Sequence, residues 1–198
     1  NKSHNCNAKF YKVDITNSEE LKSIKTALLS DYGAIHCLIN NAAVNPKIES
    51  GKPFGRLESY ELDSWHHELN VGLTGAFLCS QIFGSEMAKQ KHGSIINISS
   101  DLGLIAPNQS LYEQQGLSPE EQPTKPVTYS VIKHGLIGLT RYVATYWAKE
   151  GVRCNALCPG GVFNGQDEAF VKKLSTLIPM GDRKSTRLNS SHQIISYA

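Results

Sequence analysis

The sequence lacks several features that would assign it to a class directly. No apolar run approaches the ~20 residues of a transmembrane helix, and the polar start Asn1–Asn7 has neither a Met nor the apolar stretch of a signal peptide. No C-x-x-C pair occurs among the five cysteines, which argues against a zinc ribbon or a disulfide framework. We therefore expect a globular protein of the reducing cytoplasm, and we expect the chain to be the middle of a longer protein.

An excess of one charge sign is also missing. Lys and Arg number 20 against 18 Asp and Glu, a formal charge of +2, and only Lys172–Lys173 and Arg183–Arg187 resemble basic clusters. A nucleic-acid partner is not expected, since such binders gather Lys and Arg on one face, and neither is a membrane. With 40% hydrophobic and 19% charged residues, the 198-residue chain has the composition of one folded domain, or most of a larger one.

No metal site is expected from the candidate ligands. Cys154 and Cys158 stand four apart on a predicted strand, so both face one side, where we interpret them as small buried hydrophobic residues. His66, His67 and His134 have no ligand-type partner at helical spacing and are interpreted as surface histidines.

Strand-like and helix-like patterns alternate along the chain, which indicates an α/β fold with a parallel sheet and helices on both faces. Thr16 and Glu19 form a capping-box pattern at the first helix. The predicted strands are 9–15, 35–39, 94–99 and 152–157, and the predicted helices are 16–33, 59–91, 127–149 and 166–177.

Polar residues follow each predicted strand. Open parallel sheets bind ligands beyond the carboxyl ends of their strands, so this placement is a first functional signal, although ordinary turn chemistry explains it too. The residues are Asp14, Asn40–Ala43, Ser99–Asp101 and Pro159–Gly161.

Tyr129 and Lys133 stand four residues apart at the start of a predicted helix, which places both side chains on one face. An ammonium near a phenol favours the phenolate and lowers the tyrosine pKa, and a tyrosine tuned in this way can act as a general acid or base. The spacing alone arises by chance in many helices, so it gains meaning only from its context.

That context is an ordered set of motifs. Together, and in this order, they resemble the short-chain dehydrogenase/reductase family from about Lys9 to Met180. The motifs are Asn40-Asn41-Ala42-Ala43 after a strand, Asn70 in N-V-G-L-T-G, Asn97-Ile98-Ser99-Ser100 before Gly103, Tyr129-Ser130-Val131-Ile132-Lys133, and Asn155 to Gly160.

The resemblance implies a Rossmann-like doubly wound sheet in three α/β/α layers and a catalytic set of four residues. Tyr129 exchanges a proton with the substrate oxygen, and Lys133 lowers its pKa and binds the nicotinamide ribose. Ser100 hydrogen-bonds the reacting oxygen, and is preferred to Ser99 because two residues and Gly103 follow it. Asn70 is expected to hold a water that links Lys133 to solvent.

The resemblance also implies NAD or NADP as the cofactor. Asn164 stands where the family often has a threonine that contacts the carboxamide. The implied cofactor residues are Asp14, Ile15, Asn40, Ala42 and Ala43 on the adenosine side, and Tyr129, Lys133, Pro159, Gly160 and Val162 on the nicotinamide side.

The glycine-rich phosphate loop of the family does not occur, since only thirteen residues precede Asp14. Dinucleotide folds need glycines where the pyrophosphate meets a helix N-terminus. We expect the domain to be truncated at both ends, without the first βαβ portion, the residue that discriminates NAD from NADP, and the last strand. The 198 residues alone are then expected to be inactive, and tight NAD(P) binding by them would contradict this.

Residues 108–125 form an insertion, because Tyr129 follows Ser100 by 29 positions, more than the family usually has. A solvated loop and a lid that shapes the substrate site are equally good interpretations. Similar insertions occur in family members of surface-sugar and flagellin-glycan pathways, which suggests a sugar or sugar-nucleotide substrate.

Residues 182–198 differ in character from residues 1–181, which we interpret as the partial domain. Residues 182–198 resemble the translation of a DNA-sequencing adapter, and we therefore interpret them as a non-native tail. Arg183, Lys184 and Arg187 against Asp182 account for the whole formal charge of +2.

The expected function is hydride transfer between NAD(P) and a carbonyl or secondary alcohol, with a small molecule as substrate. Two alternatives stay open: a non-catalytic binding protein of the same fold, and a sugar-nucleotide epimerase or dehydratase. The resemblance also implies a homodimer or homotetramer formed through helices 59–91 and 127–149.

Overall fold

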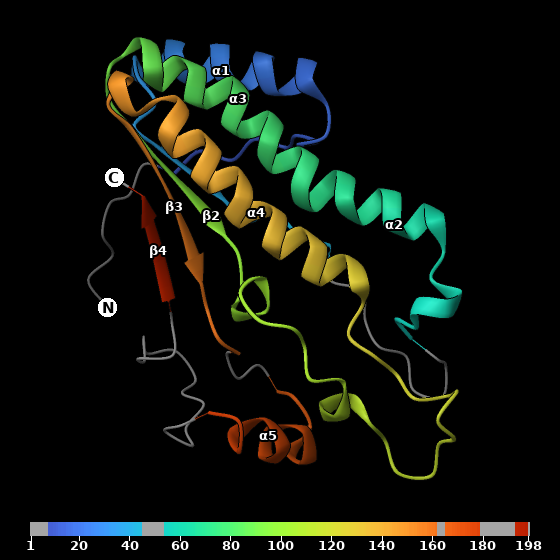
Figure 1. Ribbon diagram of the computed structural model, residues 1–198. Helices are drawn as coiled ribbons and strands as arrows, with labels where there is room; N and C mark the ends of the chain where they lie inside the picture. Colours follow the sequence, from blue (N-terminus) through green and yellow to red (C-terminus); the bar gives the residue numbers. More distant parts are fainter. Residues whose placement is uncertain (1–7, 45–53, 162–164, 179–192, 198) are drawn as a thin grey trace, which may run out of the picture.

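The computed structural model describes residues 8–44, 54–161, 165–178 and 193–197 (Figure 1). The chain alternates between strands and helices as the sequence patterns predict. The strands are β1 (Cys37–Asn40), β2 (Gly93–Ile98), β3 (Val152–Cys158) and β4 (Gln193–Tyr197), and the α-helices are α1 (Ser18–Tyr32), α2 (Leu62–Leu69), α3 (Gly75–Lys89), α4 (Val127–Tyr146) and α5 (Glu168–Ser175).

The sheet has the order β1-β2-β3-β4. β1 pairs with β2 and β2 with β3 in parallel, and α3 and α4 supply the connections between them. The predicted α/β class and the parallel arrangement of these three strands are confirmed. Their carboxyl ends point to one edge, where α5 lies in Figure 1.

The core lies between the sheet and α3 and α4. Ile95 of β2 and Cys154 and Ala156 of β3 are fully buried, whereas residues that alternate with them are partly exposed. α3 packs on β1 and β2, and α4 packs mainly on β3. The buried Cys154 and Cys158 confirm the interpretation of both as small core residues. In the described part of the chain, one face of the sheet carries this helical layer and the other is only half-buried.

The predicted strand 9–15 is wrong in this structure, because these residues run as an extended segment without a ladder partner. A strand needs a neighbour for its backbone hydrogen bonds, and no strand in the described part of the chain pairs with this segment. Val13 and Ile15 nevertheless pack against the main core cluster.

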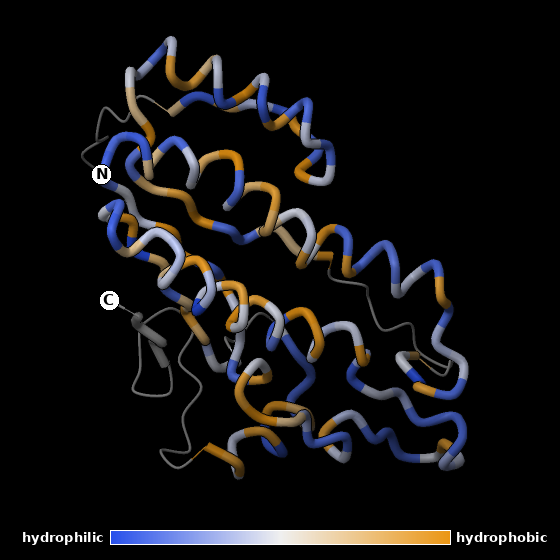
Figure 2. Tube along the Cα trace, turned by 45° about the horizontal axis from the view of Figure 1, so that its top comes forward, coloured by the Kyte–Doolittle hydropathy of each residue, from blue (hydrophilic) through white to orange (hydrophobic). Residues whose placement is uncertain are grey.

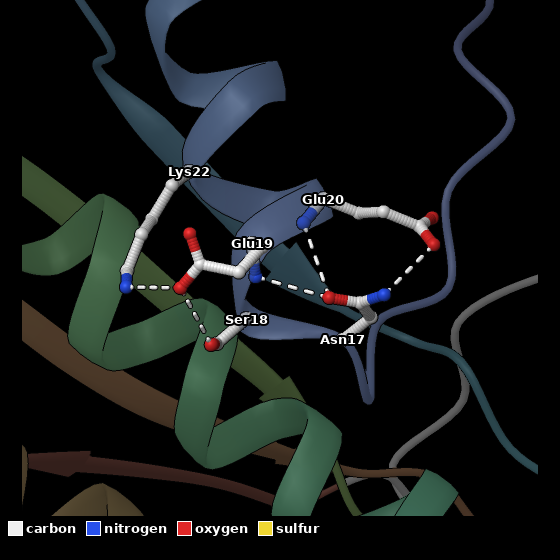
Figure 3. A network of polar contacts seen from close by, with 5 residues as sticks. All are labelled: Asn17, Ser18, Glu19, Glu20 and Lys22. Carbon is white, nitrogen blue, oxygen red and sulfur yellow. Dashed lines mark hydrogen bonds and ion pairs between the residues drawn. The ribbon is translucent and has the colours of Figure 1, made fainter.

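The amino end of α1 differs by one residue from the expected capping box (Figure 3). Asn17 is the N-cap: its Oδ1 accepts from the backbone N–H of Glu19 (3.0 Å) and Glu20 (3.3 Å), and its Nδ2 donates to Glu20 Oε1 (3.0 Å). Thr16 is not the cap; its hydroxyl and its N–H both donate to Asp14 Oδ1 at 2.8 Å. The helix ends at Gly33, which adopts a φ of 76°.

Replacing this cap gives a first testable prediction. We expect Asn17→Ala to lower the free energy of unfolding by about 1 kcal/mol, since two helix N–H groups lose their acceptor. Urea denaturation measures the change, and Asn17→Ser, which keeps a capping oxygen, should retain most of the stability. Equal losses in both variants would contradict a capping role.

The predicted helix 59–91 is a helical run from Leu62 to Lys89 with a π-helical turn, η2 (Asn70–Thr74), between α2 and α3. Such turns frequently occur at functional sites. Gly72, at the middle of η2, is buried, and a Cβ there would lie 2.9 Å from Ile132 of α4. The turn therefore allows a close approach of η2 to α4.

The adapter interpretation of 182–198 stays a prediction, and residues 182–192 lie outside the described residues. The structure does place Gln193–Tyr197 as β4, antiparallel to β3. Two isoleucines and a tyrosine give this short segment a high strand propensity, and the edge of β3 offers it unpaired backbone groups.

No helix in the described part of the chain is both long and apolar enough to cross a membrane.

Candidate active site

Tyr129 and Lys133 lie one turn apart near the amino end of α4, as the sequence predicts. Lys133 is buried and its Nζ donates to the carbonyl oxygen of Ile98, the last residue of β2, at 2.8 Å. The same Nζ is 5.7 Å from the centroid of the Tyr129 ring. α4 thus presents both side chains at the carboxyl edge of the sheet.

The two candidate serines have separate surroundings. Ser99 Oγ donates to the backbone oxygen of Lys133 (2.7 Å) and is buried, so it anchors β2 to α4. Ser100 begins the short helix η3 (Asp101–Gly103), and its hydroxyl donates to Asp101 Oδ1 (2.7 Å) and is hydrogen-bonded to Tyr129. Ser100 is thus the serine in contact with Tyr129, and its role toward the reacting oxygen stays a prediction.

The pKa of Tyr129 is raised above its ordinary value, contrary to the lowering that we expected. Burial is the main cause, and the hydrogen bond with Ser100 offsets part of it. Burial also lowers the pKa of Lys133. The negative charge of Asp101 also raises the pKa of Tyr129, and the Lys133 ammonium donates to the Ile98 carbonyl.

Two cavities meet at Tyr129 and Lys133. The larger one, about 450 Å³, is bounded by Ser100, Pro159 and Gly160 and by α5. The smaller one, about 110 Å³, is bounded by Ala43, Glu68 and Gly72. Lys125 and Tyr112 line both cavities. Tyr129 therefore lines a cleft large enough for a small molecule.

The insertion 108–125 contributes to the wall of the larger cavity. Asn108, Leu111 and Tyr112 line it, and the Tyr112 ring lies 5.6 Å, centroid to centroid, from Phe170 of α5. Lys173 of α5 donates to the backbone oxygen of Glu113 at 2.9 Å. The rest of the loop is mostly hydrophilic (Figure 2). These contacts favour the substrate-shaping interpretation of the insertion.

Asn70 does not line the cavities at Tyr129 and Lys133. Its side chain is exposed and lines neither cavity, whereas Gly72 forms the wall beside Lys133. Glu68 and Gly72 are four residues apart and share a helix face, and Asn70 lies between them on another face. The water-holding role expected for Asn70 has no support in this geometry.

The nicotinamide end of the expected cofactor fits the residues present. Pro159 and Gly160 border the larger cavity, which Tyr129 also lines, and Gly160 adds no side chain to it. Lys133 makes one hydrogen bond to a described residue, which leaves an ammonium two further donors for ribose hydroxyls. Val162 and Asn164 lie outside the described residues. No glycine-rich turn at a helix N-terminus is present in the described ranges to hold a pyrophosphate.

The residues expected on the adenosine side gather around β1. Ile15, Asn40 and Ala42 line a third cavity, of about 200 Å³. Asn40 is partly committed to the fold, because its Nδ2 donates to Asn97 Oδ1 (2.8 Å) and to Ser80 Oγ (3.1 Å). Asp14 is exposed, and its hydrogen bonds with Thr16 lower the pKa of its carboxyl group. Their contact with a cofactor stays a prediction.

Sequence reasoning missed Lys125, Glu68, Gly72 and Tyr112 as site residues. Lys125 Nζ lies 3.7 Å from the centroid of the Tyr129 ring, closer than Lys133 does. Lys125 stands four residues before Tyr129, but it lies outside α4, whose N-cap is Pro126, so helical spacing does not apply to it. Glu68 is buried, and its carboxylate accepts from the hydroxyls of Tyr60 and Thr128.

Two family models match the chain. The one described as short chain dehydrogenase matches residues 1–113, and the one described as enoyl-(acyl carrier protein) reductase matches residues 117–184. The chain belongs to the short chain dehydrogenase family. Family membership accounts for the order of the motifs around Tyr129 and for the parallel sheet that carries them.

Two curated relatives illustrate the similarity. The 2-dehydro-3-deoxy-D-gluconate 5-dehydrogenase of Bacillus subtilis is 30% identical over 76% of this chain and 50% of its own length. The post-translational flagellin modification protein A of Campylobacter coli is 31% identical over 82% of this chain and 60% of its own. The chain thus spans about half to three-fifths of the length of these relatives.

Solved structures of the family share the fold. A short chain dehydrogenase from Leptospira borgpetersenii with bound NAD+ aligns with a TM-score of 0.71 and 28% identity over 86% of this chain and 61% of that one. A gluconate 5-dehydrogenase from Burkholderia cenocepacia in complex with NADP and tartrate gives a TM-score of 0.67 and 25% identity over 87% and 61%. The Rossmann-like class expected from the motifs is thereby confirmed.

Proposed function

We propose that the protein is an NAD(P)-dependent oxidoreductase that interconverts a carbonyl and a secondary alcohol. The observation that carries the proposal is the convergence of Tyr129, Lys133 and Ser100 on one cavity at the carboxyl edge of the sheet. Membership of the short chain dehydrogenase family, with NAD+ or NADP bound in solved relatives, supports the cofactor class.

Each residue has a role that follows from its position. When bound, NAD(P) supplies or accepts the hydride. In reduction the Tyr129 hydroxyl donates its proton to the carbonyl oxygen, and in oxidation the phenolate accepts the proton of the alcohol. Ser100 hydrogen-bonds the same oxygen and orients it toward Tyr129. Lys133 would hold the nicotinamide ribose with its remaining donors, and Pro159 and Gly160 would lie on the nicotinamide side of the cofactor.

A nicotinamide absorbance assay of the full-length protein over a panel of ketones and secondary alcohols tests this proposal. We expect substrate-dependent oxidation of NAD(P)H or reduction of NAD(P)+. Conversion of substrate without net cofactor turnover would instead indicate an epimerase or dehydratase, and cofactor binding without any conversion would indicate a binding protein.

A sugar derivative is the proposed substrate class, and the cytoplasm the proposed location. The relatives named for deoxygluconate, gluconate and flagellin modification support the former. The cavity wall supports it too, because hydroxyl-rich ligands suit the mixed polar lining of Ser100, Asn108 and Gln166. Free, buried thiols at Cys79, Cys154 and Cys158 agree with a reducing compartment.

We also propose a homodimer or homotetramer that forms through α3 and α4. Phe77, Tyr142 and Tyr146 are exposed and border a groove of about 260 Å³ between these helices. Aromatic residues are enriched at protein interfaces. Sedimentation velocity should show a dimer or larger species that Tyr146→Asp reduces to a monomer, and a monomeric parent protein would contradict the proposal.

A further inference from the structure

The catalytic tyrosine has a second cation beside it that the proposed chemistry does not use. Lys125 Nζ lies 3.7 Å from the centroid of the Tyr129 ring, and its residue lines both cavities. In the described part of the chain, no carboxylate lies within ion-pair distance of it and its ammonium makes no hydrogen bond. The cation is therefore open to a ligand in the cavity.

The backbone around Lys125 is fixed. Its N–H donates to Oε1 of Gln109 at 2.8 Å, the preceding N–H of Thr124 donates to the Phe54 oxygen at 2.8 Å, and Pro126 follows. The hydrogen bond between Lys125 and Gln109 joins the two ends of the insertion 108–125, because Gln109 belongs to its first turn. The backbone of Lys125 is thereby held beside Tyr129, and the side chain reaches over the Tyr129 ring.

The acidic groups that face the cavities have partners of their own. Asp101 Oδ1 accepts from Ser100 Oγ (2.7 Å) and from the N–H of Leu102 (2.8 Å). The Glu68 carboxylate accepts from the hydroxyls of Tyr60 and Thr128. Lys133 donates to the Ile98 carbonyl. Lys125 is left as the cation whose charge no described group neutralises by contact.

Burial makes this arrangement costly without an anion. The pKa of Lys125 is lowered mainly by burial, and Lys133 lowers it further while Asp101 opposes the change. The Tyr129 ring offsets part of this cost, and an entering carboxylate would relieve more of it through a charge-assisted hydrogen bond.

We infer that Lys125 forms a carboxylate subsite next to Tyr129 and selects substrates that carry a carboxylate near the reacting carbon, as aldonic acids do, over neutral polyols. This rests on the proposed function and specifies its substrate class. A carboxylate on Lys125 would place a neighbouring carbinol or carbonyl carbon beside the Tyr129 hydroxyl, since the ammonium lies over the ring that bears it.

Kinetics with matched substrates test the selection. The full-length protein is assayed with aldonic acids and with the neutral alditols of the same carbon skeleton. Lys125→Met should raise KM for the acids by about tenfold or more and leave KM for the alditols within about twofold, while Lys125→Arg should retain the preference. Lys149→Met, an exposed lysine beyond α4, is the matched control. The same change for both substrate types, or none, would overturn the subsite.

A binding measurement separates the subsite from the proposed reaction. Calorimetric titration with tartrate, with and without NADP, should show about tenfold weaker binding to Lys125→Met than to the parent protein. If the parent turns over no carbonyl or alcohol but binds tartrate through Lys125, the proposed function fails and the subsite stands. If turnover occurs and tartrate binds both proteins equally, or neither, the subsite is refuted.

Discussion

Tyr129→Phe should lower kcat of the full-length protein by a factor of about 10² to 10⁴, because the variant loses the hydroxyl that exchanges the proton. The ring and its packing under Lys125 remain, so the affinity for NAD(P) should stay within about twofold. Steady-state kinetics give kcat, and titration of the cofactor fluorescence gives the affinity.

The control for this variant is Tyr32→Phe, which removes the same hydroxyl from an exposed position on α1. It should leave kcat unchanged. Normal turnover by Tyr129→Phe would contradict the assignment of the general acid, and a parallel loss of cofactor binding would show that the residue acts through binding instead.

Glu68→Ala should lower the free energy of unfolding by about 2–3 kcal/mol. Its carboxylate accepts from Tyr60 Oη at 2.9 Å and from Thr128, whose side chain is fully buried. The hydroxyls of Tyr60 and Thr128 can still pair with each other across 2.9 Å. One of the two hydroxyl protons therefore loses its acceptor, which costs about 1–3 kcal/mol. The removed methylenes and carboxylate also leave a void.

Thermal unfolding measures this effect as a fall in Tm of about 4–12 °C for a chain of this size. Glu61→Ala, at an exposed position just before α2, should change the free energy of unfolding by no more than about 0.5 kcal/mol. Since Glu68 joins α2 to the residue before Tyr129, an unchanged Tm would mean that the network does not hold these helices together.

The elements of this fold were predictable where the pattern was local. The short apolar runs that became β1, β2 and β3 and the helical spacing of α4 needed no tertiary information. The segment 9–15 has an equally good strand pattern, yet a strand exists only through its neighbour. The N-cap is Asn17 and not the expected Thr16. The Thr16 hydroxyl donates to Asp14 instead, a contact that the sequence does not reveal.

The candidate site was predictable for the residues that stand on regular elements. Tyr129 and Lys133 share a helix face, and Ser100 follows a strand directly, so family motifs were enough to place them. Asn70 is exposed and lines neither cavity at Tyr129, whereas Gly72 of the same π-helical turn lines the smaller one, so the role of Asn70 stays a prediction. Lys125 could not be placed from its spacing, because its position beside the ring depends on the loop that Gln109 ties down.

The central claim is that a hydride passes between the nicotinamide and the substrate carbon while Tyr129 transfers the proton. Transfer of an isotope label tests this claim most directly. The full-length protein is supplied with reduced nicotinamide that carries deuterium at the hydride-donating ring carbon and with a keto sugar acid, and the product is analysed by mass spectrometry. We predict one deuterium on the carbinol carbon of the alcohol formed, and almost none with Tyr129→Phe. A product without deuterium, or one formed equally well by Tyr129→Phe, would contradict the account.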